Sequence, residues 1–196
     1  MEEKLFDYLS KYIEMTDEEK KAITDLTIFR KYKKGTILLK EGQYSDTCYF
    51  VIKGCLRCYY IIDGEEKTTA FYTESESLNP LCTVNGQRSE HFVACVEDSI
   101  LVVSNAEMEE IIFRKFPRFE TLCRILCEEL LAKSRAEFDE FKTSSPEQRY
   151  LNLLQSRPDL LQRVPQYQLA SFLGITAQSL SRMRNRIMVE SSHNAA

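Results

Sequence analysis

The sequence has few of the residues and motifs on which enzymes depend. It contains only two histidines, His91 and His193, among 196 residues. Neither lies in a nucleophile–base motif, and the chain has no Walker loop and no glycine fingerprint for a dinucleotide. We therefore expect no enzymatic activity and assign no catalytic residue. His91 is expected to be a half-exposed residue of a strand.

Long apolar runs are also missing. No run approaches the roughly 18 residues that a membrane-spanning helix needs. The N-terminal segment MEEKLFDYLSKYIEM is charged throughout and lacks the apolar core of a signal peptide. The seven cysteines, an odd number, then indicate free thiols in a reducing compartment. These features predict a cytoplasmic protein with no membrane partner.

Positive charge is scarce overall and unevenly distributed. The net charge of −4 excludes a generally polycationic nucleic-acid binder, although it allows a local basic patch. Residues 146–196 carry six arginines and three acidic residues, whereas residues 1–145 carry 20 basic and 27 acidic ones. We interpret this asymmetry as an acidic body with a small basic C-terminal unit. It supports nucleic-acid binding only if a motif agrees.

Short strands are predicted over residues 27–103. Runs rich in Ile, Val, Tyr, Phe and Thr alternate there with turn residues, and from Gly35 to Gly64 Gly recurs at intervals of 7, 12 and 10 residues. This spacing is typical of an antiparallel sandwich or barrel without a helix of useful length. Asp63-Gly64 predicts a tight hairpin. Capping boxes that begin at Thr16 and Ser104 predict helices on either side of the strands.

A long helix is predicted from Pro117 to Lys142, with proline at its first position. Its apolar side chains are too widely spread for one core-facing stripe, so we expect it to pack on its own domain and on a partner. The predicted dimerisation residues are Leu122, Leu126 and Leu130. A hinge follows at residues 143–146, where Ser145 caps another helix.

The sequence from Gln168 to Arg182 predicts a helix–turn–helix. A short apolar helix ends at Gly174, which suits the left-handed residue of a tight turn. Thr176 can cap the next helix. In that helix Leu180, Met183 and Ile187 recur at spacings of three and four residues, which places them on one face.

The opposite face of this helix carries side chains suited to DNA. Gln178, Ser181, Arg182 and Asn185 point away from the apolar face and match base edges, while flanking arginines suit phosphates. The predicted DNA-binding set is Thr176, Ala177, Gln178, Ser179, Ser181, Arg182, Arg184, Asn185 and Arg186. The alternative is a helical hairpin whose polar face is merely solvated, in a module that binds an effector but no DNA.

These motifs resemble the Crp/Fnr family of bacterial transcription regulators. The C-terminal unit resembles the family's helix–turn–helix, and residues 34–54, KGTILLKEGQYSDTCYFVIKG, resemble the opening of its β-roll. The resemblance covers about residues 20–188. It implies a homodimer built on the long helix, an effector-sensing roll, and double-stranded DNA with an inverted-repeat site as partner. RNA polymerase is a further expected partner.

The fold class implied is α+β. We expect a jelly-roll-like, cupin-like antiparallel β-roll sensor domain with flanking helices in residues 1–116. The dimerisation helix occupies residues 117–142, and an all-α helix–turn–helix domain occupies residues 143–196. Because the chain ends soon after Ile187, we expect no β-wing after the recognition helix.

The effector site departs from the family pattern. Members that bind cyclic nucleotides hold them with a Gly-Glu segment before an Arg-Ser or Arg-Thr pair. Arg88 and Ser89 stand at the position of that pair and are the candidate effector-binding residues. Residues 76–82, ESLNPLC, lack Gly-Glu, and Pro80 removes a backbone donor. We expect a small-molecule effector and weak or no binding of cAMP, unless a nearby Glu reaches the ribose.

Two cysteine pairs raise the alternative of a metal- or redox-sensing module. Some relatives hold an iron–sulfur cluster with N-terminal cysteines, but this chain has no cysteine before Cys48. Cys55 and Cys58 are three apart in a predicted strand and so face opposite sides. Cys123 and Cys127 are one helical turn apart, a spacing more often found in apolar packing. We predict no metal ligands and no certain cofactor.

Overall fold

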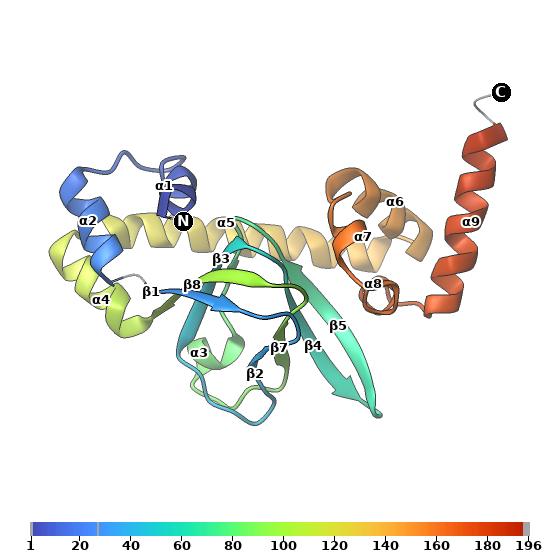
Figure 1. Ribbon diagram of the computed structural model, residues 1–196, viewed down its shortest axis with the longest axis horizontal. Helices are drawn as coiled ribbons and strands as arrows, with labels where there is room; N and C mark the ends of the chain where they lie inside the picture. Colours follow the sequence, from blue (N-terminus) through green and yellow to red (C-terminus); the bar gives the residue numbers. More distant parts are fainter. Residues whose placement is uncertain (1, 27, 194–196) are drawn as a thin grey trace. The chain divides into compact units, whose positions relative to one another are not determined.

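The computed structural model of the chain describes residues 2–26 and 28–193, with side chains up to residue 188 (Figure 1). The chain divides into two compact units. One comprises Met1–Cys58 with Phe71–Lys133, and the other comprises Tyr59–Ala70 with Ser134–Ala196. The division falls inside the hairpin of β4 (Leu56–Ile62) and β5 (Glu65–Tyr72) and inside helix α5 (Arg118–Thr143). The domain bounds expected from the sequence remain predictions.

Two helices precede the strands, α1 (Glu2–Leu9) and α2 (Asp17–Leu26). The capping box predicted at Thr16 is confirmed. The Thr16 N–H donates to Glu19 Oε2 at 2.8 Å, and the Glu19 N–H donates back to Thr16 Oγ1 at 3.3 Å. Each contact satisfies a backbone donor that the first turn of a helix leaves free.

In the described part of the chain, eight strands form two four-stranded sheets, which confirms the predicted β-roll. The first sheet has the order β1-β8-β3-β6, and the second has the order β2-β7-β4-β5. The strands are β1 (Ile28–Tyr32), β2 (Ile37–Leu39), β3 (Thr47–Lys53), β4 (Leu56–Ile62), β5 (Glu65–Tyr72), β6 (Ser77–Leu78), β7 (Phe92–Cys95) and β8 (Ser99–Asn105).

Two of the turns between strands depend on the positive φ angles or the missing Cβ of glycine. Asp63 and Gly64 have φ of 54° and 79°, the pair of positive angles that a type I′ hairpin requires. Gly54, between β3 and β4, has φ of 112°, and a Cβ there would lie 2.3 Å from Ser99 Oγ. Only glycine fits that approach. A five-residue helix, α3 (Leu81–Asn85), interrupts the strand region as a single short turn.

The central strand β3 is buried on both faces. Phe50 and Ile52 pack with Leu5 of α1 and Val102 of β8. Val51 alternates with them and is fully buried. Helix α1 therefore covers one face of the first sheet, and the other face belongs to the roll core.

The helices after the roll lie close to their predicted positions. Helix α4 (Ala106–Lys115) begins one residue later than predicted, because Asn105 Oδ1, not Ser104, accepts the N–H of Met108 at 3.0 Å. Ser104 instead pairs within the first sheet. Ser145 caps α6 (Pro146–Ser156) as predicted. Then follow α7 (Leu160–Arg163), α8 (Gln166–Leu173) and α9 (Ala177–His193).

Candidate nucleic-acid interface and effector site

The turn between α8 and α9 has the geometry that the sequence predicts. Gly174 has φ of 75°, and a Cβ there would lie 3.3 Å from Phe141 Cζ. The Ile175 N–H returns to Ala170 O at 3.0 Å, a bond that ends the helix at a left-handed residue. Thr176 Oγ1 accepts the Ser179 N–H at 3.2 Å and caps α9.

Arg149 of α6 stabilises this turn through contacts of its guanidinium group. Its guanidinium donates to Leu173 O at 2.9 Å and to Phe141 O at 2.7 Å. Its Cζ also lies 4.1 Å from the centroid of the Phe141 ring. The Arg149 side chain thereby connects α6 with the C-terminal ends of α5 and α8. Sequence spacing gave no signal for this role, because the carbonyl partners lie 8 and 24 residues away.

Helix α9 has the two faces expected from its spacing. Leu180 is fully buried, Met183 is 8% exposed, and Ile187 is half-buried. The predicted base-reading side chains are all exposed, namely Gln178, Ser181, Arg182 and Asn185, as are Thr176 and Ala177. Since the apolar face is occupied by packing, the polar face is presented outward.

The flanking arginines of α9 differ from each other. Arg184 is half-buried, whereas Arg186 is exposed and forms an ion pair with Glu147 in the first turn of α6. Ser179 is half-buried. Beside them lies an open cleft of about 570 Å³, lined by Ser145, Pro146, Glu147, Ile175, Ser179, Arg182, Met183 and Arg186. One predicted phosphate contact thus already has an acidic partner.

The β4–β5 hairpin contacts the helix–turn–helix through Ser171 of α8. Ser171 Oγ accepts the Thr68 N–H at 2.9 Å and donates to Glu66 O at 3.0 Å. The hydroxyl therefore bonds the backbone of strand β5. This contact was missed at the level of sequence, because an isolated serine on a helix carries no pairing signal.

The candidate effector residues Arg88 and Ser89 form contacts within their own unit. Arg88 Nη1 donates to Gly42 O at 2.7 Å, and its Cζ lies 4.8 Å from the Tyr44 ring centroid. Ser89 is buried, and its hydroxyl donates to His91 O at 2.8 Å. Arg88 itself is exposed. The Gly42 contact uses one of the five N–H donors of the guanidinium.

The glutamates near this pair also have intramolecular partners. Glu74 Oε1 accepts the Gly54 N–H at 2.9 Å. Glu76 Oε2 accepts the Thr73 N–H at 2.7 Å, and its other oxygen pairs with Lys133. Both carboxylates therefore stabilise turns of the roll. A ribose hydroxyl would have to share these carboxylates with the bonds that already hold them.

The expectation for His91 was wrong. It precedes β7 rather than lying in a strand, and it is only 6% exposed. Hydrogen bonds between the Ser89 hydroxyl and the His91 backbone fold residues 89–91 into a tight bend. The His91 imidazole ring is buried at this bend. Burial lowers the pKa of the imidazole, because the charged form loses solvation.

The predicted dimerisation residues are partly covered by their own chain. Leu122 is buried, and Leu126 and Leu130 are half-buried. The exposed apolar side chains of α5 include Leu131, Phe138 and Phe141, which are 71%, 59% and 45% exposed. With exposed Cys127, these recur at helical spacings of four, seven and three, so they share one face.

The cysteines are reduced thiols, and most of them are shielded from water. Cys55 and Cys58 are buried, and burial raises the pKa of the Cys58 thiol to about 12. Burial also raises the pKa of Cys123 to about 12. The thiolate, which is the nucleophilic and metal-binding form, is thereby disfavoured. Among the described residues, no group of three or more His, Cys, Asp or Glu side chains could hold a metal ion.

Comparison with known proteins confirms the resemblance at the level of fold. Residues 29–115 match the family model of the cyclic nucleotide-binding domain. No curated protein sequence matches the chain significantly. No described helix has both the length and the apolar character for a membrane span.

Solved structures of Crp/Fnr-type regulators resemble almost the whole chain. The c-di-GMP responsive global regulator CLP of Xanthomonas campestris has a TM-score of 0.69 at 16% identity, over 90% of this chain and 93% of that one. FixK2 of Bradyrhizobium japonicum has a TM-score of 0.69 at 15% identity, over 84% and 86%. The catabolite activator protein of Thermus thermophilus has a TM-score of 0.55 at 19% identity, over 94% and 88%. The chain thus has a β-roll followed by a helix–turn–helix, as expected.

Proposed function

We propose that this protein is a homodimeric transcription regulator that binds double-stranded DNA through α9. The observation that carries the proposal is the division of α9 into two faces. Leu180 and Met183 are buried, while Gln178, Arg182 and Asn185 are exposed on the opposite side. Arg pairs well with guanine and Gln or Asn with adenine in the major groove. If the polar face of α9 were only solvated, neither these residue types nor the turn held by Arg149 would be required.

The proposed dimer pairs two copies of α5 through its exposed apolar face. Cys127, Leu131, Phe138 and Phe141 recur at spacings of four, seven and three residues, which fit the heptad pattern of a coiled-coil seam. Exposed aromatic and leucine side chains in such a row favour burial against a second helix. A two-fold dimer presents two recognition helices to successive major grooves about 34 Å apart, so the site is an inverted repeat.

The roll is proposed to sense a small molecule other than cAMP. Support comes from the contacts that Arg88, Ser89, Glu74 and Glu76 make within the roll. A cyclic nucleotide held in the family manner needs the arginine and a carboxylate to face the ligand. Here each of these groups already holds a backbone turn, and Pro80 supplies no N–H.

The test is selection of binding sites from random duplex DNA, followed by measurement of the dissociation constant on the recovered site. Arg182→Ala should weaken binding by about 10- to 100-fold and relax preference at one base pair in each half-site. Lys21→Ala removes the same charge from an exposed position on α2, outside both α9 and the proposed seam, and is the matched control. Equal affinity and base preference for Arg182→Ala and the wild type would refute the role of α9.

A further inference from the structure

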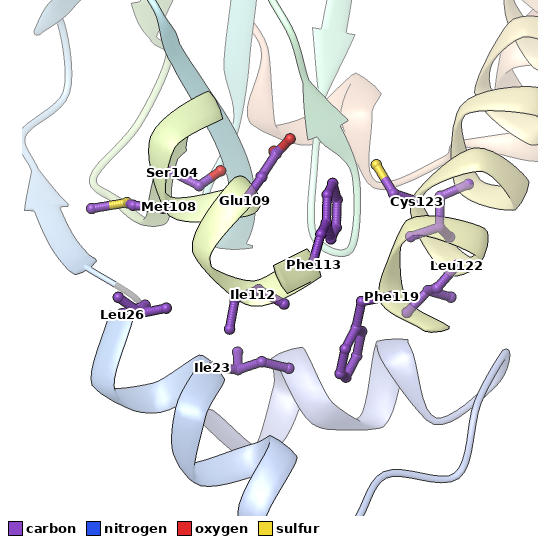
Figure 2. A pocket seen from close by; sticks show the side chains of 11 residues that line it. Ile23, Leu26, Ser104, Met108, Glu109, Ile112, Phe113, Phe119, Leu122 and Cys123 are labelled. Atoms are coloured by element: carbon purple, nitrogen blue, oxygen red, sulfur yellow. The ribbon is translucent and has the colours of Figure 1, made fainter. Parts of the chain in front are cut away.

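A second candidate ligand site lies outside the roll, between α2, α4 and α5. A pocket of about 190 Å³ opens there, and most of its walls are apolar. Figure 2 shows Ile112 and Phe113 of α4 facing Phe119 and Leu122 of α5, with Ile23 of α2 nearby. The other lining residues are Leu26, Ser104, Met108, Glu109, Cys123 and Leu126.

Helix α4 is incompletely packed over this pocket. None of its residues is fully buried, although Met108, Ile112 and Phe113 form an apolar face toward the chain interior. Close-packed helices usually bury such side chains completely. The apolar lining therefore lacks contact partners that an occupant could supply.

The size of the pocket fixes the size of the occupant. An engineered apolar cavity of about 150 Å³ binds benzene, so this pocket suits a bicyclic ring or a ring with a short substituent. The two phenylalanine rings, together with the sulfur atoms of Met108 and Cys123, favour an aromatic guest. A protein segment would need a longer groove than these residues provide.

Polar groups gather at one end of the pocket. Figure 2 shows the Glu109 carboxyl, the Ser104 hydroxyl and the Cys123 sulfur at the same end. Glu109 is half-buried at the pocket, and burial raises the pKa of its carboxyl because the charged form loses solvation. A ligand N–H or O–H would offset that lost solvation, whereas a ligand anion would be repelled.

We propose that this pocket binds a small, uncharged aromatic molecule that carries one hydrogen-bond donor, with the donor directed to Glu109. The occupant would touch three helices at once and hold α4 against α2 and α5. The site is separate from Arg88 and Ser89 and from α9, so the proposal does not depend on DNA binding. Indole has the required size and donor and is the probe for the test.

The experiment follows the methionine methyl groups of the full-length protein by NMR during titration with indole. Met108 lines the pocket, whereas Met15 and Met183 lie outside its lining and serve as internal references. The Met108 signal should shift with a dissociation constant on the order of 0.1–1 mM, and the references should not. Indene, which lacks the N–H, should bind about five-fold more weakly. Indole-3-acetate should bind weaker still.

A pair of variants separates pocket binding from surface binding. Ile112→Phe fills the pocket and should abolish the indole-induced shift. Ile111→Phe adds the same ring next to it on α4, at a position that is 47% exposed, and should leave binding unchanged. Equal indole binding by both variants, or equal shifts at all three methionines, would overturn the proposal. So would a Met108 signal that responds to protein dilution but not to indole, because a second copy would then cover the pocket.

Discussion

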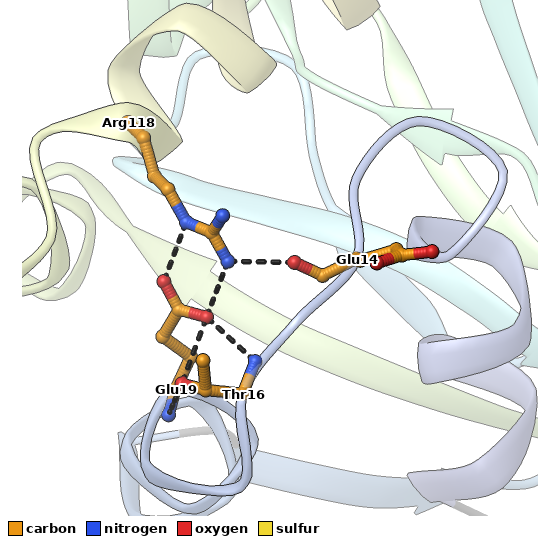
Figure 3. A network of polar contacts seen from close by, with 4 residues as sticks. All are labelled: Glu14, Thr16, Glu19 and Arg118. Atoms are coloured by element: carbon orange, nitrogen blue, oxygen red, sulfur yellow. Dashed lines mark hydrogen bonds and ion pairs between the residues drawn. The ribbon is translucent and has the colours of Figure 1, made fainter.

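Glu19 holds α2 against the start of α5, and its replacement gives a stability change that depends on pH. Its carboxylate accepts hydrogen bonds from Arg118 Nε at 2.6 Å, from Arg118 Nη2 and from the Thr16 backbone N–H. Figure 3 shows this network. Arg118 also donates to Glu14 O at 2.7 Å. The Glu19 side chain is 6% exposed, whereas that of Arg118 is 46% exposed.

The size of the expected stability change follows from the pKa of Glu19. The hydrogen bonds from Arg118, followed by those from Thr16, lower this pKa from 4.5 to about 2, against the opposing effect of burial. At about 1.36 kcal/mol per unit, that shift sets an upper limit of about 3.4 kcal/mol. Since Arg118 is half exposed, solvent screening reduces the expected value to about 2 kcal/mol.

The sign of the pH dependence is fixed by the direction of the shift. A carboxyl whose pKa is lowered on folding contributes its full stability above its unfolded pKa, near 4.5. That contribution is lost as the pH falls through about 2. Glu19→Gln should therefore unfold about 2 kcal/mol more easily than the wild type at pH 7, and the difference should shrink as the pH falls from 5 to 2.

The assay is urea unfolding followed by circular dichroism at a series of pH values. Glu18→Gln is the matched control, because Glu18 is the neighbouring residue and its ion pair with Lys115, at 3.2 Å, is exposed. Its effect should stay below about 0.5 kcal/mol at every pH. A Glu19→Gln penalty that is the same at pH 7 and pH 2 would show that the network contributes through packing rather than through charge.

Three further outcomes are expected. Glu147→Gln frees Arg186 for a phosphate, so DNA binding should tighten and its dependence on salt should steepen by about one unit for each freed contact. Ser171→Ala removes both hydrogen bonds to the β4–β5 hairpin, so hydrogen exchange at the Thr68 amide should accelerate about 10-fold. Mild oxidation should link two chains through Cys127, because this exposed thiol lies on the proposed seam.

Each of these outcomes has its own control. Gln155→Glu adds a charge on an exposed part of α6, away from Arg186, and should not tighten DNA binding. Ser156→Ala on α6 should leave exchange at Thr68 unchanged. Cross-linking should persist in Cys123→Ser and disappear in Cys127→Ser. A covalent dimer that forms without Cys127 would refute the proposed seam.

The sequence by itself determined the features that depend on near neighbours. The Thr16 capping box, the Asp63-Gly64 hairpin, and the Gly174 turn with its Thr176 cap each require only residues within about four positions. Such bonds form from local geometry and residue chemistry, so a short stretch of sequence suffices. The spacing of Leu180 and Met183 likewise determined which face of α9 is buried.

Tertiary structure alone decided which partners meet across long stretches of chain. Leu122 faces its own unit, Arg186 meets Glu147, and Ser171 reaches Thr68 across 103 residues. His91 is buried although its neighbours in sequence gave no such signal. These contacts depend on how completed helices and sheets pack, and packing is set by the summed shape and burial of many side chains. No local pattern encodes that sum, which is why the charge partners of α9 and the apolar pocket beneath α4 emerge only from the folded chain.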